Sequence, residues 1–463
     1  MMKLRLSQLW RTLSVALVTS IACATPKTNV ILIFVDDLGY GDLGCYGAEK
    51  IRTPHLDRMA AEGVRFTDFY VAAEVCTPSR AALLTGRYPL RSGMCGDIER
   101  VLFPNSKGGL PSNEITIAEA LRGAGYATMH IGKWHLGIHE GSRPLEQGFE
   151  HSFGLPYSND MDARPNLPKG ATSSETPPVD GWNVALMRDG KVVEKPADQT
   201  TLTKRYTEES VKFIGEHKTQ PFFLYLAHTF PHVPLFASAD FKGKSKAGIY
   251  GDAVEELDWS VGKILETLRE QKLEENTLVV FTSDNGPWLI MGERGGSAGP
   301  LRDGKGSTWD GGMRVPCLAW MPGRIKPAVS SQMVQAMDWF PTALSLAQVE
   351  PPQGVVLDGV NLSPLLFENA TLPERPYFFY RGPHLYACRI GQWKAHFSTQ
   401  GGSGGQPKQS HQPPLLYDLA NDLGEKTDVA ADHPKVLEKI ATAVQSHQAA
   451  MVPGKKQLKS TDP

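Results

Sequence analysis

The sequence predicts an α/β protein in which helices flank a doubly wound, mostly parallel β-sheet, followed by a smaller C-terminal α+β subdomain. Two observations predict the sheet: short apolar segments recur along the chain, and amphipathic helical segments separate them. A third predicts the subdomain, because this alternation ends near Pro341 in a chain of 463 residues, whereas single cores stop growing at about 250–300 residues. We therefore expect a main domain at residues 25–342 and the subdomain at 343–450.

Four segments have the pattern of buried parallel strands. Residues 29–35 form an apolar run that stops at Asp36 and Asp37, as expected for a strand buried on both faces. Similar runs follow at residues 126–131, 222–227 and 277–282. Because such sheets bind ligands at the carboxyl ends of their strands, the polar residues after these runs are the first candidates for a site.

Helical periodicity fills the intervals between the strands. The apolar spacing predicts helices at residues 54–62, 112–122, 202–216 and 250–271. Ser112 is the predicted cap of the second helix, since a serine side chain accepts N–H bonds at a helix start. Residues 160–198 are rich in Pro, Gly, Asn and Ser, and we expect a long excursion over the site.

The C-terminal part contains shorter elements. The pattern predicts strands at residues 377–381, 387–390 and 393–397, and a last amphipathic helix at 433–447. The glycine-rich residues 401–405 predict a flexible loop. Residues 451–463 are polar, and we expect them to form a flexible tail.

The N-terminus has the layout of an export signal. Residues 1–24 carry three basic residues and no acidic one, then an apolar run and the small residues Ala22-Cys23-Ala24. Cleavage after Ala24 is the favoured prediction, and a lipid anchor on Cys23 is the weaker one. No stretch reaches the about 20 apolar residues that span a bilayer. We therefore predict an exported protein without an integral membrane segment: periplasmic or secreted, or in the secretory pathway or lysosome of a eukaryote.

The charge and cysteine content exclude several classes of protein. The chain has 48 Lys and Arg against 50 Asp and Glu, and 41% of its residues are hydrophobic. This composition excludes a disordered chain and a broadly basic surface for nucleic acid. Six cysteines without a Cys-x-x-Cys pair are too few for a disulfide scaffold or structural zinc. Disulfides or, preferably, buried free thiols are the open alternatives for Cys45, Cys95, Cys317 and Cys388.

Carboxylates cluster after two of the predicted strands. Asp36 and Asp37 follow the first strand, and Asp284 and Asn285 follow the last. Any one of them alone would more commonly cap a helix or turn. Three carboxylates brought together repel one another unless a cation neutralises them. Ligation by carboxylate and amide oxygens suits Ca²⁺, or Mg²⁺ as second choice, so we predict one divalent ion at these residues.

The most specific motif is Cys76-Thr77-Pro78-Ser79-Arg80. With it, the chain resembles the type I sulfatases, whose Cys-x-Pro-x-Arg signature directs oxidation of the cysteine to formylglycine. Other segments resemble this family in the same order, at residues 29–41, 132–137, 156–160, 231–234, 282–286, 301–306 and 416–419. The resemblance implies an alkaline-phosphatase-like fold, hydrolysis of small-molecule or carbohydrate sulfate monoesters, and a formylglycine-generating maturation enzyme that acts on residues 76–80.

The resemblance also implies the roles of the nucleophile and the cations. Cys76, as a formylglycine hydrate, would bind the metal and attack sulfur with one hydroxyl, and its second hydroxyl would expel sulfate from the covalent hemiester. A helix starting near Ser79 would favour an anion at residue 76. Arg80 would orient the formylglycine hydroxyl, whereas Lys133 and Lys305 would hold the sulfate oxygens.

Matching to the family also assigns the acid and base. His135 would deprotonate the second hydroxyl during breakdown of the hemiester. His232, together with Lys305, would protonate the leaving oxygen, although His228 competes for this role. Ser158 would be a lesser hydrogen-bonding partner of the hydrate.

Two alternatives to a sulfatase remain open from sequence: a phosphate or phosphonate monoester hydrolase of the same superfamily, and a non-catalytic glycan-binding protein. A dianionic phosphate would require more compensating cations than a sulfate, and a non-catalytic protein would be expected to have a broken site. Substrate choice is expected to lie in residues 160–198 and in the C-terminal subdomain. Candidate side chains there are Arg164, Trp182, Arg188, Tyr380, Arg381 and His384.

Overall fold

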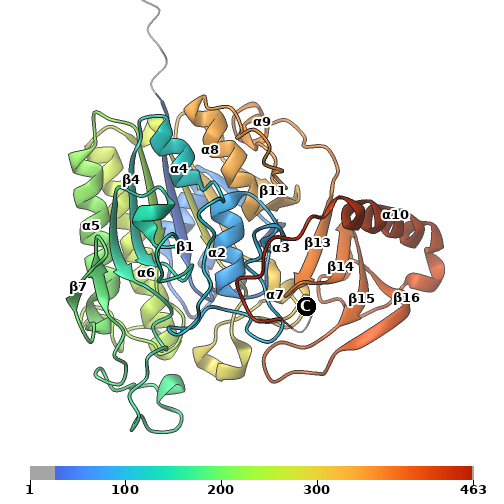
Figure 1. Ribbon diagram of the computed structural model, residues 1–463, viewed down its shortest axis with the longest axis horizontal. Coiled ribbons are helices and arrows are strands. Elements are labelled where there is room, and N and C mark those ends of the chain that lie inside the picture. Colours follow the sequence, from blue (N-terminus) through green and yellow to red (C-terminus); the bar gives the residue numbers. More distant parts are fainter. Residues whose placement is uncertain (1–26, 461–463) are drawn as a thin grey trace, which may run out of the picture.

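The computed structural model describes residues 27–460, so the predicted export segment lies outside the described residues. Figure 1 shows a large α/β part that is built around a sheet and a smaller part, formed by the C-terminal end of the chain, beside it. Among the described residues, no helix combines the length and the apolar composition that crossing a membrane requires.

A sheet of ten strands forms the centre of the large part, in the order β11-β2-β10-β9-β1-β8-β4-β5-β6-β7. The five neighbouring strands β9, β1, β8, β4 and β5 run parallel to one another. Strand β10 pairs antiparallel with β9, β6 with β5, and β7 with β6. The predicted mostly parallel sheet is therefore confirmed, with antiparallel pairs toward its edges. The strands are β1 Asn29–Val35, β2 Val64–Phe66, β4 Ala127–Lys133, β5 His151–Leu155, β6 Leu186–Arg188, β7 Lys191–Glu194, β8 Phe222–Ala227, β9 Thr277–Ser283, β10 Cys317–Trp320 and β11 Ala328–Ser330. A separate pair joins β3 Phe69–Tyr70 to β12 Val334–Gln335.

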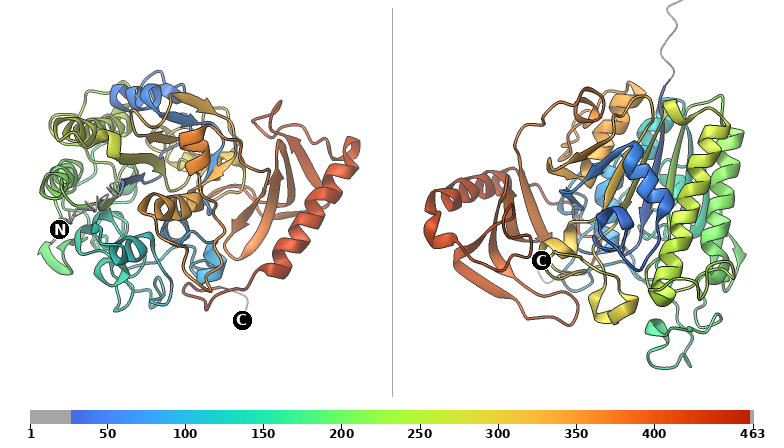
Figure 2. Two further views of the ribbon diagram at one scale, coloured as in Figure 1. Left: turned by 90° about the horizontal axis from the view of Figure 1, so that it is seen from above. Right: turned by 180° about the vertical axis from the view of Figure 1, so that it is seen from behind.

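Helices cover both faces of the sheet, because the alternate side chains of strand β1 are apolar on both faces. Ile31 and Ile33 pack into one core with side chains of α1, α5 and α6, whereas Leu32 and Phe34 pack into the other with side chains of α2, α4 and α8. Figures 1 and 2 show these helices on the two sides of the strands. The helices are α1 Pro54–Glu62, α2 Cys76–Thr85, α3 Pro89–Ser92, α4 Ile117–Gly123, α5 Leu202–Glu216, α6 Gly248–Glu270, α7 Asp310–Met313, α8 Trp339–Ala347 and α9 Ser363–Glu368.

Two helix starts differ from the sequence prediction. Helix α4 is capped by Thr116 rather than Ser112, because Thr116 Oγ1 accepts the N–H of Glu119 at 3.1 Å and the Glu119 carboxylate accepts the N–H of Thr116 at 2.8 Å. Helix α2 begins at Cys76 itself rather than near Ser79. Proline is compatible with this earlier start, since the first turn of a helix leaves its N–H groups without intrahelical acceptors.

The C-terminal part is an antiparallel sheet with one helix packed across it (Figure 1). The elements are β13 Pro376–Arg381, β14 His384–Ile390, β15 Trp393–Thr399, β16 Gln409–Asp418 and α10 Pro434–Ala450. Strand β16 was not among the predicted strands, because Pro413 and Pro414 interrupt its pattern. It lies at the edge of the sheet, where proline is tolerated.

The last described residues differ from the predicted flexible tail. Residues 451–460 run back along the large part, where the N–H of Gly454 donates to the Leu90 carbonyl and the N–H of Gln457 to the Gly93 carbonyl, both at 2.9 Å. Leu458 is buried in the core of the large part. The polar composition concealed this packing, because backbone groups and a single leucine make these contacts.

Candidate active site

The polar residues that follow β1 and β9 lie side by side. These strands are parallel neighbours, so the residues after both leave the same edge of the sheet. The N–H of Asp37 donates to Asp284 Oδ1 at 3.2 Å, and Asn285 Nδ2 donates to Asp37 Oδ1 at 2.7 Å. The structure thus brings together all four predicted metal ligands, Asp36 included, and buries them.

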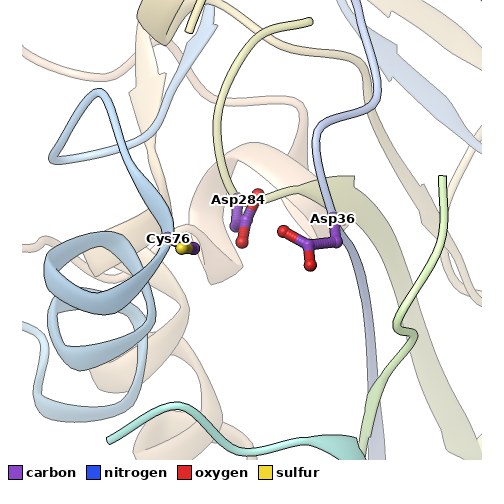
Figure 3. A group of neighbouring side chains, drawn as sticks. All are labelled: Asp36, Cys76 and Asp284. Atoms are coloured by element: carbon purple, nitrogen blue, oxygen red, sulfur yellow. The ribbon is translucent and has the colours of Figure 1, made fainter. Parts of the chain in front are cut away.

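Cys76, the first residue of α2, faces these carboxylates. One ligand atom from each of Asp36, Cys76 and Asp284 lies within 4.8 Å of the other two. Figure 3 shows that the three side chains come from separate segments: the loop after β1, the start of α2 and the loop after β9. Burial raises the pKa of the Cys76 thiol. An unmodified cysteine here is therefore a poor nucleophile, because the thiolate is the reactive form.

Two buried cations neutralise the carboxylates from α2 and β4. Arg80, one helical turn after Cys76, donates to Asp284 Oδ2 from Nη2 at 2.7 Å and from Nε at 3.0 Å. Lys133, the last residue of β4, donates to Asp36 Oδ2 at 2.5 Å. Both cations are fully buried, which charged side chains rarely are unless they are paired.

Lys305 and His232 meet at Asp37. Lys305 Nζ donates to Asp37 Oδ2 at 2.8 Å, and His232 Nε2 lies 3.6 Å from the same oxygen. His232 Nδ1 lies 2.5 Å from the Val233 carbonyl, which assigns the proton to Nδ1 in the neutral ring and leaves Nε2 toward the site. Trp288 packs against both side chains, with its ring centre 4.5 Å from Lys305 Nζ and 5.4 Å from the His232 ring centre. Sequence reasoning missed Trp288, although its place just after the strand-end motif was an available signal.

Ser158 and His135 lie near Lys133. Ser158 Oγ is 3.2 Å from Lys133 Nζ. His135 Nε2 is 2.7 Å from the Leu102 carbonyl, and the buried Nδ1 has no hydrogen-bond partner among the described residues. Thr77 Oγ1 donates to the His135 carbonyl at 3.1 Å, which ties this residue to the first turn of α2. Burial, followed by the charge of Lys133, lowers the pKa of His135 well below its usual value, so its ring is neutral at pH 7.

The charges of the site nearly balance without a metal. Burial alone would raise the pKa of Asp36, but Lys133 and the other cations hold it well below the usual range. Burial and the neighbouring Asp36 raise the pKa of Asp284 to about 7. Repulsion between the carboxylates is therefore relieved in part by the cations of this chain. The three carboxylates alone therefore do not require a metal.

Two buried oxygen atoms that lack hydrogen-bond donors favour a metal at this site. Asp36 Oδ1 and Asn285 Oδ1 are buried, and neither has a hydrogen-bond donor in the described part of the chain. The Arg80 guanidinium approaches Asp36 Oδ1 only to 3.5 Å. Leaving a buried acceptor unsatisfied costs about 1–3 kcal/mol. A hard divalent cation would satisfy both atoms, so the residues present fit such an ion.

Two residues considered from sequence lie outside the site. His228, the competitor of His232, packs beside the helices instead: its Nε2 is 3.3 Å from Ser260 Oγ, and its ring centre is 6.1 Å from that of Tyr206. Trp182, a candidate for stacking on a sugar, is 1% exposed and belongs to the core. Neither side chain is available to a substrate.

Comparisons with known proteins identify the family of this chain. A family model described as Sulfatase covers residues 28–349, and one described as C-terminal region of aryl-sulfatase covers residues 372–463. Arylsulfatase A from Homo sapiens is 43% identical over 92% of this chain and 89% of its own length. N-acetylgalactosamine-6-sulfatase from Sus scrofa is 40% identical over 95% of this chain and 89% of its own. The crystal structure of Ps i-CgsB in complex with k-i-k-neocarrahexaose matches with a TM-score of 0.78 at 31% identity, over 94% of this chain and 95% of that one. The chain therefore belongs to the sulfatase family of sulfuric ester hydrolases.

Proposed function

We propose that this sulfatase hydrolyses sulfate monoesters with a nucleophile made from Cys76, beside one divalent cation that is Ca²⁺ or, as second choice, Mg²⁺. The observation that carries the proposal is the space shared by Cys76, Asp36 and Asp284, whose ligand atoms lie within 4.8 Å of one another. Three buried or nearly buried cations surround this space. Such a preorganised site stabilises negative charge on a group undergoing transfer.

The metal would be held by carboxylate and amide oxygens together with the oxidised side chain of residue 76. The protein ligands in this proposal are Asp36, Asp37, Asp284 and Asn285, which supply the oxygen donors that Ca²⁺ prefers. When bound, the ion supplies positive charge that polarises the sulfate and lowers the pKa of a hydroxyl beside it.

Formylglycine, made from Cys76 by a maturation enzyme, would supply a hydrated aldehyde whose hydroxyl attacks sulfur. The chain itself contributes orientation. Arg80 lies on the same face of α2 as Cys76, one turn later, and is fixed by Asp284 and by the Lys133 carbonyl at 3.1 Å. A guanidinium held in this way keeps its charge and its donors beside residue 76 without reorganising during the reaction.

Lys133 and Lys305 would hold the sulfate oxygens. Each ammonium group is bonded to one carboxylate of the proposed metal site, Lys133 to Asp36 and Lys305 to Asp37. If those carboxylate oxygens bound the metal, the two ammonium groups would be able to donate to the substrate instead. Ser158, bonded to Lys133, would keep that side chain in place.

Two histidines would move the protons. His232 and Lys305 share one oxygen of Asp37, so both lie on the side of the site where a leaving alcohol oxygen would need a proton. Lys305 would give it from its ammonium group, and His232 would give it from Nε2 when its ring carries a second proton. His135 would be the base toward the second hydroxyl. Its Nε2 is committed to the Leu102 carbonyl, and its free Nδ1 is therefore the basic atom.

A phosphate or phosphonate ester hydrolase and a non-catalytic glycan-binding protein have less support. Three carboxylates already offset the three cations, so the bound metal would supply the excess charge, which is enough for a sulfate monoester. A non-catalytic relative would be expected to have lost the nucleophile or one of its charged partners. Cys76 and all of those partners are present.

We propose a small-molecule or carbohydrate sulfate ester as substrate and an exported location. Support for a carbohydrate comes from the name N-acetylgalactosamine-6-sulfatase and from the saccharide bound to Ps i-CgsB. Support for export comes from the layout of residues 1–24.

The proposal is tested with protein made in the presence and absence of a maturation enzyme. Mass spectrometry of the peptide with residue 76 should show a loss of about 18 Da, the change from thiol to aldehyde. The oxidised protein should cleave 4-nitrophenyl sulfate far faster than a phenyl phosphonate monoester. Cys76→Ala should be inactive, whereas Cys95→Ala, which changes another buried free thiol, should stay active. Full activity of Cys76→Ala, or a preference for the phosphonate, would contradict the proposal.

Chelation tests the metal separately. A cation that binds only the folded protein stabilises it, so removal of the ion with EDTA should lower both the sulfatase activity and Tm. Readdition of Ca²⁺ should restore both. Unchanged activity and Tm after complete removal of the ion would contradict the metal site.

A further inference from the structure

Two arginines that no proposed step uses lie against the loop that carries Lys305. Arg381, the last residue of β13, donates from Nη1 to the Gly306 carbonyl at 2.7 Å and to the Gly401 carbonyl at 3.2 Å. Arg100 reaches the same glycine, because a Cβ atom built on Gly306 would lie 3.3 Å from both Nη1 and Nη2 of Arg100. Both guanidinium groups therefore lie beside the residue that directly follows Lys305.

A buried carboxylate holds Arg100 in this position. Arg100 donates to Glu74 Oε1 from Nε at 3.2 Å and from Nη2 at 2.7 Å. The Glu74 side chain is 1% exposed, whereas that of Arg100 is 21% exposed. The Glu74 carbonyl also accepts the N–H of Gly306 at 2.9 Å. Since Glu74 lies two residues before Cys76, the arginine pair lies beside the segments of both the nucleophile and Lys305.

Hydrogen bonds to carboxylates satisfy only part of the arginine pair. Among the described residues, Glu74 is the one carboxylate that either guanidinium bonds, and the acceptors of Arg381 are both carbonyl oxygens. Arg100 Nη1 and Arg381 Nε and Nη2 have no acceptor in the described part of the chain, and none of these atoms is sealed from solvent. Burial, and next the charge of Arg100, lowers the pKa of Arg381, and the carboxylates of Glu74 and Asp303 offset this only in part.

We infer that Arg100 and Arg381 bind a second anionic group of the substrate, a carboxylate or a second sulfate, while the ester sulfate occupies the site of Cys76. This inference rests on the proposed function of that site. Guanidinium groups bind carboxylate and sulfate oxygens through paired N–H donors, and such charge-assisted bonds are about twice as strong as neutral ones. The preferred substrate is therefore a sulfated acidic saccharide rather than an ester with a single negative charge.

Four sets of sulfate esters test this inference on the oxidised, metal-loaded protein. They are 4-nitrophenyl sulfate, sugars with one sulfate, sugars with a second sulfate, and sugars with one sulfate and a uronate carboxylate. We expect kcat/KM to be about 10-fold or more higher for one of the last two sets than for the singly charged sugars. The last two sets show which anion the arginine pair prefers.

Substitutions test whether the arginine pair causes the preference for substrates with a second anionic group. Arg100→Gln and Arg381→Gln should each lower kcat/KM on the preferred set about 10–100-fold, mainly through KM, and the loss on 4-nitrophenyl sulfate should be much smaller. Arg381→Lys keeps a positive charge beside Gly306 but changes the packing of the side chain. It therefore distinguishes the effect of the charge from the effect of the packing. Arg87→Gln is the matched control, because Arg87 forms a similar buried pair with Glu114 and is 17% exposed. This control should keep the full preference.

Four outcomes decide between the two claims. Equal kcat/KM of the unsubstituted protein on all sets would overturn the inference, and so would equal losses on all sets in Arg100→Gln and Arg381→Gln. If the fully oxidised protein cleaved no set, 4-nitrophenyl sulfate included, the proposed function itself would be wrong. A preference that disappears only in the arginine variants supports both claims.

Discussion

Asp37 shows how a single residue organises the site. Its backbone has φ of 64°, a left-handed conformation that residues other than glycine rarely adopt. Such strain costs about 1–3 kcal/mol. The N–H of Asp37 bonds Asp284, and its two carboxylate oxygens accept from Asn285 and Lys305. These bonds offset the strain and join the proposed metal ligands to the lysine that would hold the sulfate.

Trp288 provides a test of the packing around two residues of the proposed site, Lys305 and His232. Trp288→Leu removes the ring against Lys305 and His232, so both side chains lose a fixed position. We expect kcat/KM on 4-nitrophenyl sulfate to fall about 10-fold or more, since misplaced donors stabilise the transition state less well. Trp259→Leu is the control, because Trp259 packs on Phe241 and touches none of the proposed catalytic residues. Equal activity of the two variants would contradict the role of Trp288.

Asp258 predicts a pH dependence of stability. It accepts the N–H groups of His55 and Leu56 at the start of α1, and burial raises its pKa from the ordinary 3.8 to about 7. The folded protein therefore keeps a proton that the unfolded chain releases. This stabilising contribution is complete below pH 4 and is lost as the pH rises through 7.

Asp258→Asn stays neutral at every pH and removes this titration. We expect Tm of the variant, relative to the unsubstituted protein, to rise between pH 5 and pH 8 by about 2 °C or more. Asp180→Asn, at a side chain that is 73% exposed, should show no such trend. Parallel Tm profiles for Asp258→Asn and the unsubstituted protein would show that burial does not raise the pKa of Asp258.

At the scale of elements, close contact between β4 and β8 positions Lys133. Gly132 has φ of 107°, and a Cβ atom there would lie 1.8 Å from the Ala227 carbonyl oxygen of β8. Only glycine permits this approach, and the next residue is Lys133. The strand geometry therefore fixes where Lys133, which we propose holds the sulfate, leaves the sheet.

Gly132→Ala should separate the strands and displace Lys133. We expect a loss of about 3 kcal/mol or more in the free energy of unfolding and a loss of most activity. Gly125→Ala is the control: Gly125 also has positive φ, at 85°, but a Cβ atom there would meet nothing within 4 Å. It should cost about 1 kcal/mol and leave kcat unchanged. Similar losses of stability and activity in the two variants would show that close contact with β8 does not position Lys133.

Elements with strong local patterns were predictable from sequence. The bounds of β1, β8, α1 and α5 match the expected ranges, because continuous apolar runs and helical periodicity identify buried strands and amphipathic helices. The cap of α4 was misplaced, since Ser112 and Thr116 both fit a cap and only the reciprocal bond to Glu119 selects Thr116. The packing of residues 451–460 was not predictable, because it depends on backbone bonds to distant residues.

The candidate site was predictable where residues belong to sequence motifs. Cys76, Arg80 and the strand-end carboxylates form ordered motifs, and the structure brings them together. Trp288 and Arg100 belong to no such motif. Their roles depend on contacts with Lys305 and Gly306, which lie far from Arg100 in the chain and are set only by the fold.

At the scale of the whole molecule, buried charges join the C-terminal part to the active-site loops. Lys394 of β15 bonds Asp310 Oδ1 at 2.8 Å and Glu425 Oε1 at 2.9 Å, and all three side chains are fully buried. Asp310 begins α7, where the Gly312 carbonyl accepts the N–H of Gly286 at 3.0 Å. The C-terminal part thus holds the turn that supports the loop of Asn285.

Lys394→Met tests this connection. The substitution removes the ammonium group shared by two buried carboxylates and leaves Asp310 its longer pair with Arg314, at 3.3 Å. We therefore expect the free energy of unfolding to fall by about 3 kcal/mol or more and kcat to fall with it. Lys439→Met, which breaks an exposed pair with Glu374, should cost at most about 1 kcal/mol. If Lys394→Met kept full activity and stability, the C-terminal part would not support the site.

The central claim, that residue 76 is the nucleophile only after oxidation, has one direct measurement. Preparations that differ in the oxidised fraction of Cys76, measured by mass spectrometry, are assayed for sulfate release from 4-nitrophenyl sulfate. The rate should rise in proportion to the oxidised fraction and extrapolate to zero for the unmodified thiol. A rate that does not depend on this fraction would contradict the account.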